Sequence, residues 1–226
     1  MLQLATSCLQ GRPMQAAAEA LLALRPDGLQ LTPGNAPTPG FEAWLVGAGV
    51  PHSAHHGFCF EALRAPVWRP DGRCRWRGRS VHPPRLDDAA APHLEARVEM
   101  GDLAEVCLET MYPGYRLGTG AEVEWAMQAG LRLAVDVSHV FLQLEAGVMG
   151  PSTWRRLQDY PRLEEVHVSA NDGRRDRHRP LAPDTFGLGW ARARLAASGT
   201  VVIESYLHRL DADARAAQVD LLREGT

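Results

Sequence analysis

The sequence contains no lysine, so all 24 of its Lys-plus-Arg cations are arginine. This absence excludes a lysine Schiff base and a phosphate-binding loop that depends on a lysine amine. Isoleucine is almost absent too, because Ile203 is the only one among many Ala, Leu and Val residues. Because lysine is missing, any catalytic chemistry must come from other polar side chains.

Paired cysteines and long apolar runs are also missing. Four cysteines are scattered without a Cys-x-x-Cys spacing, at Cys8, Cys59, Cys74 and Cys107. We see no charged leader with a signal-cleavage pattern, and no apolar stretch approaches the roughly 20 residues that span a bilayer. We therefore expect a reduced, cytoplasmic protein with no membrane partner.

Length and charge narrow the class of protein further. The 226 residues are 45% hydrophobic and 23% charged, which is ordinary globular composition, and they carry a formal net charge of −3. That balance disfavours a protein that holds nucleic acid by overall positive charge, so a nucleic-acid partner would need a local basic patch. A small-molecule substrate fits the composition better.

Short apolar runs alternate with helix-like segments along the chain. The runs that we predict as strands are Leu2–Cys8, Gly28–Thr32, Val50–His56, Arg79–His82, Glu105–Thr110, Leu131–Val137, Leu163–Ser169 and Thr200–Glu204. Eight strands separated by helices, at roughly 28 residues per unit, fit a compact α/β fold, the (β/α)8 or TIM barrel. A doubly wound open sheet would alternate similarly, but the glycine-rich phosphate fingerprint is missing after the first run. We predict a single barrel domain over residues 1–226.

The segment Val67–Arg77 interrupts this alternation between the third and fourth predicted strands. Its centre is the turn sequence Pro70-Asp71-Gly72, so the flanking residues could pair as a small hairpin insertion. In a barrel this insertion would lie beside the catalytic mouth, where Trp68 or Trp76 could stack on a sugar or base. The alternative is a solvated arginine-rich loop with both tryptophans packed on the barrel rim.

Potential metal ligands lie at or just beyond the carboxyl ends of the predicted strands, which meet on one face of a barrel. They are His56, His82, Glu109, Asp136, His139, His167, Asp176, His178 and Glu204. Glu109 and Asp136 directly follow apolar runs and would be costly to bury without compensation. Mixed histidine and carboxylate ligation suits Zn, Mn, Fe or Co, and this set could hold one to three ions. For Asp176 and His178, surface ion pairing in an arginine-rich loop is the alternative.

The third strand offers several histidines. Side chains alternate with a period of two, so His52 and His56 share one face and His55 points to the other. We predict His56 as the ligand because it is nearest the strand end. His55 replaces it if the register differs by one residue.

These motifs resemble those of the xylose isomerase-like TIM-barrel superfamily, which includes sugar isomerases and epimerases, apurinic-site nucleases of the endonuclease IV type, and iron-dependent peptide-modifying enzymes. The most specific similar segments are Leu108-Glu109-Thr110, Asp136-Val137-Ser138-His139, His167 through Asp176-Arg177-His178, and Ile203-Glu204. The resemblance implies that Glu109, Asp136, His167 and Glu204 bind the metal. It also implies that the residues matching His56, His82, His139, Asp176 and His178 complete the three-metal cluster of the nuclease branch.

The resemblance favours a sugar or sugar-phosphate isomerase or epimerase. In this hypothesis Glu109 and Glu204 exchange a proton at a substrate carbon as general bases, assisted by a divalent metal. Trp68, Trp76 and Arg175 are the candidate substrate-binding residues, with Phe58 as a further aromatic.

Three other functions remain open. Cleavage of abasic DNA in the manner of endonuclease IV is favoured by the complete ligand set but disfavoured by chain length and charge. An iron-dependent peptide-modifying oxidase would use the same ligands and require oxygen. A non-catalytic ligand-binding barrel would bind little metal.

Overall fold

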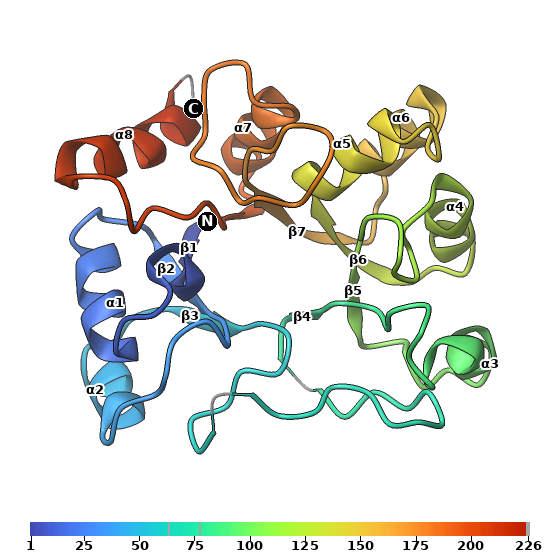
Figure 1. The fold of residues 1–226 in the computed structure, drawn as a ribbon, viewed down its shortest axis with the longest axis horizontal. Coiled ribbons are helices and arrows are strands. Elements are labelled where there is room, and N and C mark those ends of the chain that lie inside the picture. The colour runs from blue at the N-terminus through green and yellow to red at the C-terminus, as the bar shows by residue number, and fades with distance from the viewer. Residues whose placement is uncertain (63, 77, 225–226) are drawn as a thin grey trace.

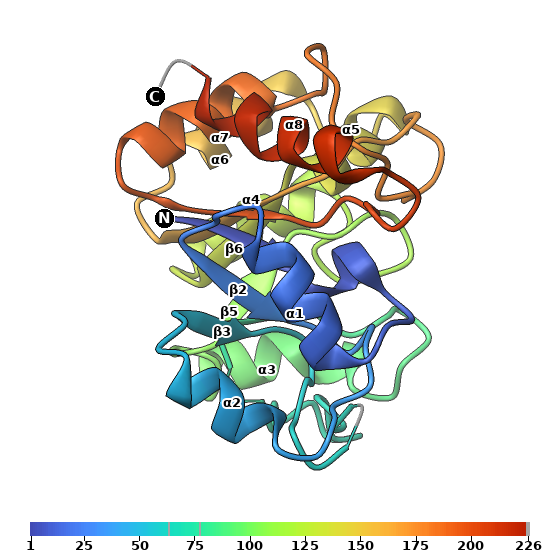
Figure 2. The same cartoon turned by 90° about the vertical axis from the view of Figure 1, so that its left-hand side faces the viewer.

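The computed structural model describes residues 1–62, 64–76 and 78–224. Its strands form the inner ring of the molecule, and the helices lie outside them (Figures 1 and 2). The strands are β1 (Leu2–Ala5), β2 (Gly28–Leu31), β3 (His52–Ala54), β4 (Ser80–Val81), β5 (Cys107–Glu109), β6 (Arg132–Asp136), β7 (Leu163–Val168) and β8 (Thr200–Ile203). The helices are α1 (Met14–Leu22), α2 (Phe41–Gly47), α3 (Leu94–Glu99), α4 (Gly120–Gln128), α5 (Val137–Glu145), α6 (Pro151–Gln158), α7 (Leu188–Ala196) and α8 (Ala212–Arg223), with short 3-10 turns η1 (Thr6–Leu9) and η2 (Ala91–His93).

The hydrogen-bonded strand order is β3-β2-β1-β8-β7-β6-β5-β4, and the paired strands run parallel. One parallel bridge, His55 to Ser80, joins the two ends of this order. The His56 N–H donates to the Ser80 carbonyl at 3.0 Å, and the Arg79 N–H donates to the Ala54 carbonyl at 2.8 Å. The α/β fold class and the predicted (β/α)8 barrel are confirmed.

The apolar core lies between the strands and the surrounding helices. In β8, Val201, Val202 and Ile203 are fully buried, as expected for parallel strands that are covered on both faces. In α1, Met14 and Leu21 are also fully buried and lie two turns apart on one face. Within the described part of the chain, no helix is both long and apolar enough to cross a membrane.

The barrel interior is polar beneath its carboxyl end. Gln30 on β2 donates to Glu165 on β7 at 3.3 Å, and Ser53 on β3 donates to Gln3 on β1 at 3.0 Å. Neither contact joins neighbouring strands, so both side-chain pairs meet inside the barrel. Polar groups therefore support the carboxyl end from below.

A hairpin follows β3 where the other units carry a helix. Trp68 and Cys74 form an antiparallel bridge, and Gly72 adopts a φ of 80° in the turn. The Arg97 side chain of α3 donates to the Asp71 carbonyl at 2.9 Å. The turn of the hairpin therefore packs against α3 on the outside of the barrel, as its course between α2 and α3 shows (Figure 1). Arg77, the last residue of the predicted insertion, lies outside the described residues.

Candidate metal centre

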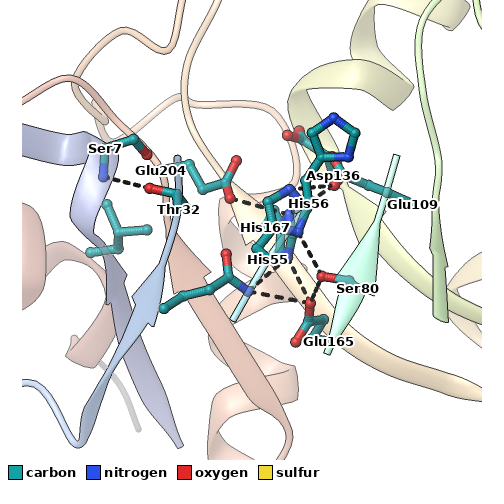
Figure 3. Close-up of polar contacts among 12 residues, drawn as sticks. Ser7, Thr32, His55, His56, Ser80, Glu109, Asp136, Glu165, His167 and Glu204 are labelled. Atoms are coloured by element: carbon teal, nitrogen blue, oxygen red, sulfur yellow. Dashed lines mark hydrogen bonds and ion pairs between the residues drawn. The ribbon is translucent and has the colours of Figure 1, made fainter. Parts of the chain in front are cut away.

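Glu109, at the end of β5, is surrounded by imidazoles. Its Oε2 atom lies 3.4 Å from Nε2 of His55, from Nε2 of His82 and from Nδ1 of His167. Its Oε1 atom lies 3.3 Å from Nδ1 of His139, and the Glu109 side chain is fully buried. Figure 3 shows Glu109, His55 and His167 directed toward one another from separate strands and loops. Four histidines distant in sequence therefore share one carboxylate.

A second group of side chains extends from this centre toward the loop after β7. His139 Nε2 lies 3.6 Å from Asp136 Oδ2 and 3.4 Å from Asp176 Oδ2. His178 Nε2 lies 3.1 Å from Asp176 Oδ2. These contacts bring the Asp-x-His pair of the loop to the same end of the barrel as Glu109.

The local structure after β6 explains how Asp136 and His139 come together. Asp136 caps α5, because its Oδ1 atom accepts from the N–H of Ser138 at 2.6 Å and of His139 at 3.1 Å. His139 then lies in the first turn, and its Nδ1 atom contacts the Thr110 carbonyl at 2.9 Å. Asp136 Oδ2 and His139 Nε2 are left to face the centre.

The donor set fits a divalent cation. Among the described residues, three groups place one ligand atom each within 4.8 Å of one another: His55, Glu109 and His167; Glu109, Asp136 and His139; and Asp136, His167 and Glu204. Several of these atoms are buried without a hydrogen-bond partner, namely Glu109 Oε1 and Oε2, Asp136 Oδ2, His139 Nε2 and His167 Nδ1. Buried polar atoms without partners are costly, and a bound cation would compensate them. Oxygen and imidazole donors suit Zn, Mn, Fe or Co.

Burial sets the charge of two of the histidines. It lowers the pKa of His55 to about 3 and that of His82 to about 4. Both imidazoles are therefore neutral at pH 7, which is the form that binds a metal.

The other histidines respond to neighbouring carboxylates. Burial opposes the charge of His167, but Glu204 and Glu109 outweigh it and raise the pKa of His167 well above its ordinary value. Burial likewise opposes the charge of His139, but Asp136 and Asp176 raise its pKa well above the usual range. A metal that binds at these atoms must displace protons.

The pKa values of the two glutamates at the centre, Glu109 and Glu204, are shifted in opposite directions. Burial raises the pKa of Glu204 to about 7, and the charge of Glu109 acts in the same direction. Burial also acts to raise the pKa of Glu109, but His82 and His167 outweigh it and hold that pKa well below its ordinary value. Glu204 is thus the carboxylate that can change protonation near neutral pH.

A cavity of about 260 Å³ opens above this cluster. Glu204, Asp176, His139 and His178 form part of its wall, and Glu109 is not among the described residues that line it. The aromatic and amide side chains around it are Tyr112, Tyr115, Tyr206 and Gln10. Glu204 can therefore reach a molecule in the cavity, whereas Glu109 lies below as a ligand candidate. That Glu109 also acts on the substrate as a base stays a prediction.

The structure brings His55, and not His56, to the ligand cluster. Ser53 faces the barrel interior, and His55 follows it by two residues and therefore points the same way. His56 has a φ of 40°; its Nδ1 atom accepts from the His82 N–H at 3.2 Å, and its Nε2 atom contacts Arg64. His56 lines the cavity but has no place in the three ligand groups.

The predicted substrate-binding residues occupy different places. Trp68 donates to the His82 carbonyl at 2.9 Å and lines a groove with His56 and Tyr115 beside the cavity. Trp76 lines a separate pocket with Val81 of β4 and with residues between 101 and 107, which lead into the amino end of β5, away from the carboxyl end that holds the cluster. Arg175 is exposed in the loop after β7, and Phe58 is buried in the core. None of Trp76, Arg175 and Phe58 is among the described residues that line the cavity, and their role in substrate binding stays a prediction.

Sequence reasoning missed a polar layer beneath the ligands. Glu165 contacts His167 Nε2 at 3.0 Å, and Ser80 contacts His55 Nδ1 at 2.9 Å. The signal was weak, because a Glu-x-His spacing on a strand shows only that both side chains share a face. The tyrosines of the cavity were missed too, since they lie in loops.

No protein-family model and no curated protein sequence matches the chain. Solved structures do match it. A D-tagatose 3-epimerase-like protein superposes with a TM-score of 0.66 at 14% identity, covering 99% of this chain and 96% of that one. The E. coli 3-keto-D-glucoside 4-epimerase gives 0.61 at 15% identity, covering 99% and 98%. A protein from Anabaena variabilis described as a sugar phosphate isomerase/epimerase gives 0.59 at 11% identity, covering 99% and 97%.

These likenesses concern the fold. The chain is a TIM barrel with a fold similar to that of these three proteins, and the predicted resemblance is confirmed at the level of the fold. Each match covers nearly the whole of both chains.

Proposed function

We propose that this protein is a divalent-metal-dependent isomerase or epimerase that acts on a sugar or sugar phosphate. The observation that carries the proposal is the set of buried, unpartnered carboxylate and imidazole atoms beneath a cavity that Glu204 lines. Structural neighbours named as epimerases support the same reaction class.

Glu109, Asp136, His167 and Glu204 would hold the ion, with His55, His82 and His139 as further donors. A divalent cation bound there supplies charge stabilisation to a substrate oxygen, which makes the neighbouring C–H more acidic. The acidity gained in this way brings proton removal within reach of a carboxylate of ordinary basicity.

Glu204 is the residue that we assign to proton transfer. It lines the cavity, so its carboxylate can exchange a proton with a molecule bound there. Asp176 also lines the cavity, but His139 and His178 pair with it. One accessible carboxylate suits an isomerase, which moves a proton between adjacent carbons on one face of the substrate; an epimerase would also need a proton donor on the opposite face.

The polar aromatic wall suits a polyol. Tyr112, Tyr115 and Tyr206 line the cavity with aromatic side chains that carry hydroxyl groups, and Gln10 adds an amide. Hydroxyl and amide groups match the hydrogen-bonding surface of a sugar, while the rings pack against its C–H faces.

The test is exchange of substrate carbon-bound hydrogen with solvent deuterium, measured on a panel of aldoses, ketoses and their phosphates with added Mn²⁺ or Zn²⁺. The Glu204→Gln variant is expected to lose both exchange and turnover. Glu99→Gln, at the exposed end of α3, is the matched control and is expected to retain both. Exchange at the wild-type rate in Glu204→Gln contradicts the assignment.

A multi-metal phosphodiesterase is the second candidate, and a specific observation favours it. Asp176 and His178 join His139 beside the Glu109 cluster, which extends the donor set beyond what one ion needs. This reading expects about three ions per chain and incision of abasic DNA that weakens steeply with salt. Elemental analysis of protein purified without added metal separates the candidates, since one ion favours the isomerase. Iron with oxygen-dependent turnover would instead identify the oxidase.

A further inference from the structure

We propose that Glu165 is a positioning residue that orients His55 and His167 and fixes which nitrogen of each ring faces the metal centre. The inference rests on the proposed metal-dependent function. It concerns a carboxylate that lies outside the three ligand groups and does not line the cavity.

Glu165 lies fully buried in β7, two residues before His167, and four donors converge on it. Its Oε1 atom accepts from His167 Nε2 at 3.0 Å, from Gln30 Nε2 at 3.3 Å and from the Ser80 hydroxyl. Its Oε2 atom accepts from Arg79 Nε at 3.2 Å. Figure 3 shows Glu165 below His55 and His167, on the far side of both rings from Glu109.

The hydrogen-bond directions in this network are determined by chemistry. An ionised carboxylate can only accept, so His167 must carry its hydrogen on Nε2 to donate to Glu165. Once a metal displaces the Nδ1 proton, the Nδ1 lone pair lies on the side that is 3.4 Å from both Glu109 and Glu204. The carboxylate thus presents the ligand nitrogen of His167 to the centre.

The same reasoning extends to His55 through Ser80. The Ser80 hydroxyl donates its only proton to Glu165, so its oxygen accepts from His55 Nδ1–H at 2.9 Å. His55 Nε2 then carries a lone pair and faces Glu109 at 3.4 Å. One buried carboxylate therefore sets the tautomers of two imidazoles from distant parts of the barrel, His55 just after β3 and His167 on β7.

The experiment measures Zn²⁺ affinity by competition with a chelator in Glu165→Gln and in the matched control Glu164→Gln. Glu164 is the adjacent residue of β7, and its side chain pairs with Arg132 at 3.0 Å instead of a histidine. Loss of an outer-shell partner typically weakens metal binding about 10- to 100-fold, and we expect that loss in Glu165→Gln. Glu164→Gln is expected to bind Zn²⁺ as the wild type does.

The outcomes separate this inference from the proposed function. If the wild type binds no Zn²⁺, the proposed metal-dependent function fails. If the wild type binds Zn²⁺ and Glu165→Gln binds it equally well, the positioning role is refuted even where Glu165→Gln lowers the melting temperature.

A second measurement does not require any variant to fold. In the Zn²⁺-loaded wild type, imidazole ¹H–¹⁵N spectra are expected to show a hydrogen on Nε2 of His167 and on Nδ1 of His55. The opposite tautomer at either ring overturns the inference.

Discussion

Replacing Glu109 with glutamine removes the carboxylate that belongs to two of the three ligand groups found among the described residues. The amide keeps the size of the side chain but loses the charge, and one of its two oxygens becomes an N–H₂ donor facing imidazoles at 3.3 to 3.4 Å. Because loss of an outer-shell partner already weakens binding about 10- to 100-fold, loss of this shared ligand should cost at least about 100-fold.

The loss of Zn²⁺ affinity can be measured as a smaller rise in melting temperature when Zn²⁺ is added. At a free Zn²⁺ concentration of 100 times the wild-type Kd, binding stabilises the folded state by about 2.7 kcal/mol. For a domain of this size that corresponds to a rise of about 5 to 11 °C. With affinity reduced about 100-fold, the same Zn²⁺ concentration gives only about 0.4 kcal/mol, or roughly 1 °C.

The assay is thermal unfolding followed by circular dichroism, with and without Zn²⁺, for the wild type, Glu109→Gln and the control Glu105→Gln. Glu105 precedes the same strand, and its side chain is 88% exposed. Glu105→Gln should retain the full Zn²⁺-induced shift. An undiminished shift in Glu109→Gln would refute the reasoning that the buried carboxylate is a shared metal ligand.

Two further predictions concern the metal centre and the packing of the fold. Metal affinity should fall as pH is lowered toward 6, because the raised pKa values of His139 and His167 mean that protons compete with the metal for the ligand nitrogens. Calorimetry in two buffers of different ionisation enthalpy should detect the protons released when the metal binds. If no protons are released, the protonation states assigned to these histidines are wrong. Gly187→Ala should destabilise the fold by about 2 kcal/mol, since Gly187 has a φ of 75° and an added Cβ would lie 2.8 Å from Val137 Cβ. The control is Gly189→Ala, because Gly189 lies in α7 with open space around it; this substitution should raise the free energy of unfolding in urea by up to about 1 kcal/mol. Equal effects of the two substitutions would show that neither backbone strain nor the contact with Val137 matters at Gly187.

Local spacing was sufficient to predict part of the candidate site. Asp136 and His139 are predictable because a strand that runs directly into a helix places the capping residue and the residue three positions later on the same turn. Glu109 and Glu204 are predictable because each follows an apolar run that ends at the barrel mouth.

The remaining features depend on contacts between distant segments. The inward direction of His55 follows from a Ser53–Gln3 contact across the barrel, which the alternation of side chains alone does not specify. Glu165 is separated by 135 residues from Gln30 and by 85 from Ser80, so its role follows only from the closed barrel. The position of Trp76 depends on how the hairpin packs along the wall, which turn sequences do not determine.

The closure between β3 and β4 has a consequence for the mechanics of the molecule. The two edges meet through one β-bridge, His55 to Ser80, so this junction has the shortest pairing of the strand junctions among the described residues. His55 stands on one side of the junction and His82 on the other, with their Nε2 atoms 3.1 Å apart. An ion bound by both rings would cross-link the two edges of the barrel at this junction, so separation of β3 from β4 would be coupled to release of the ion.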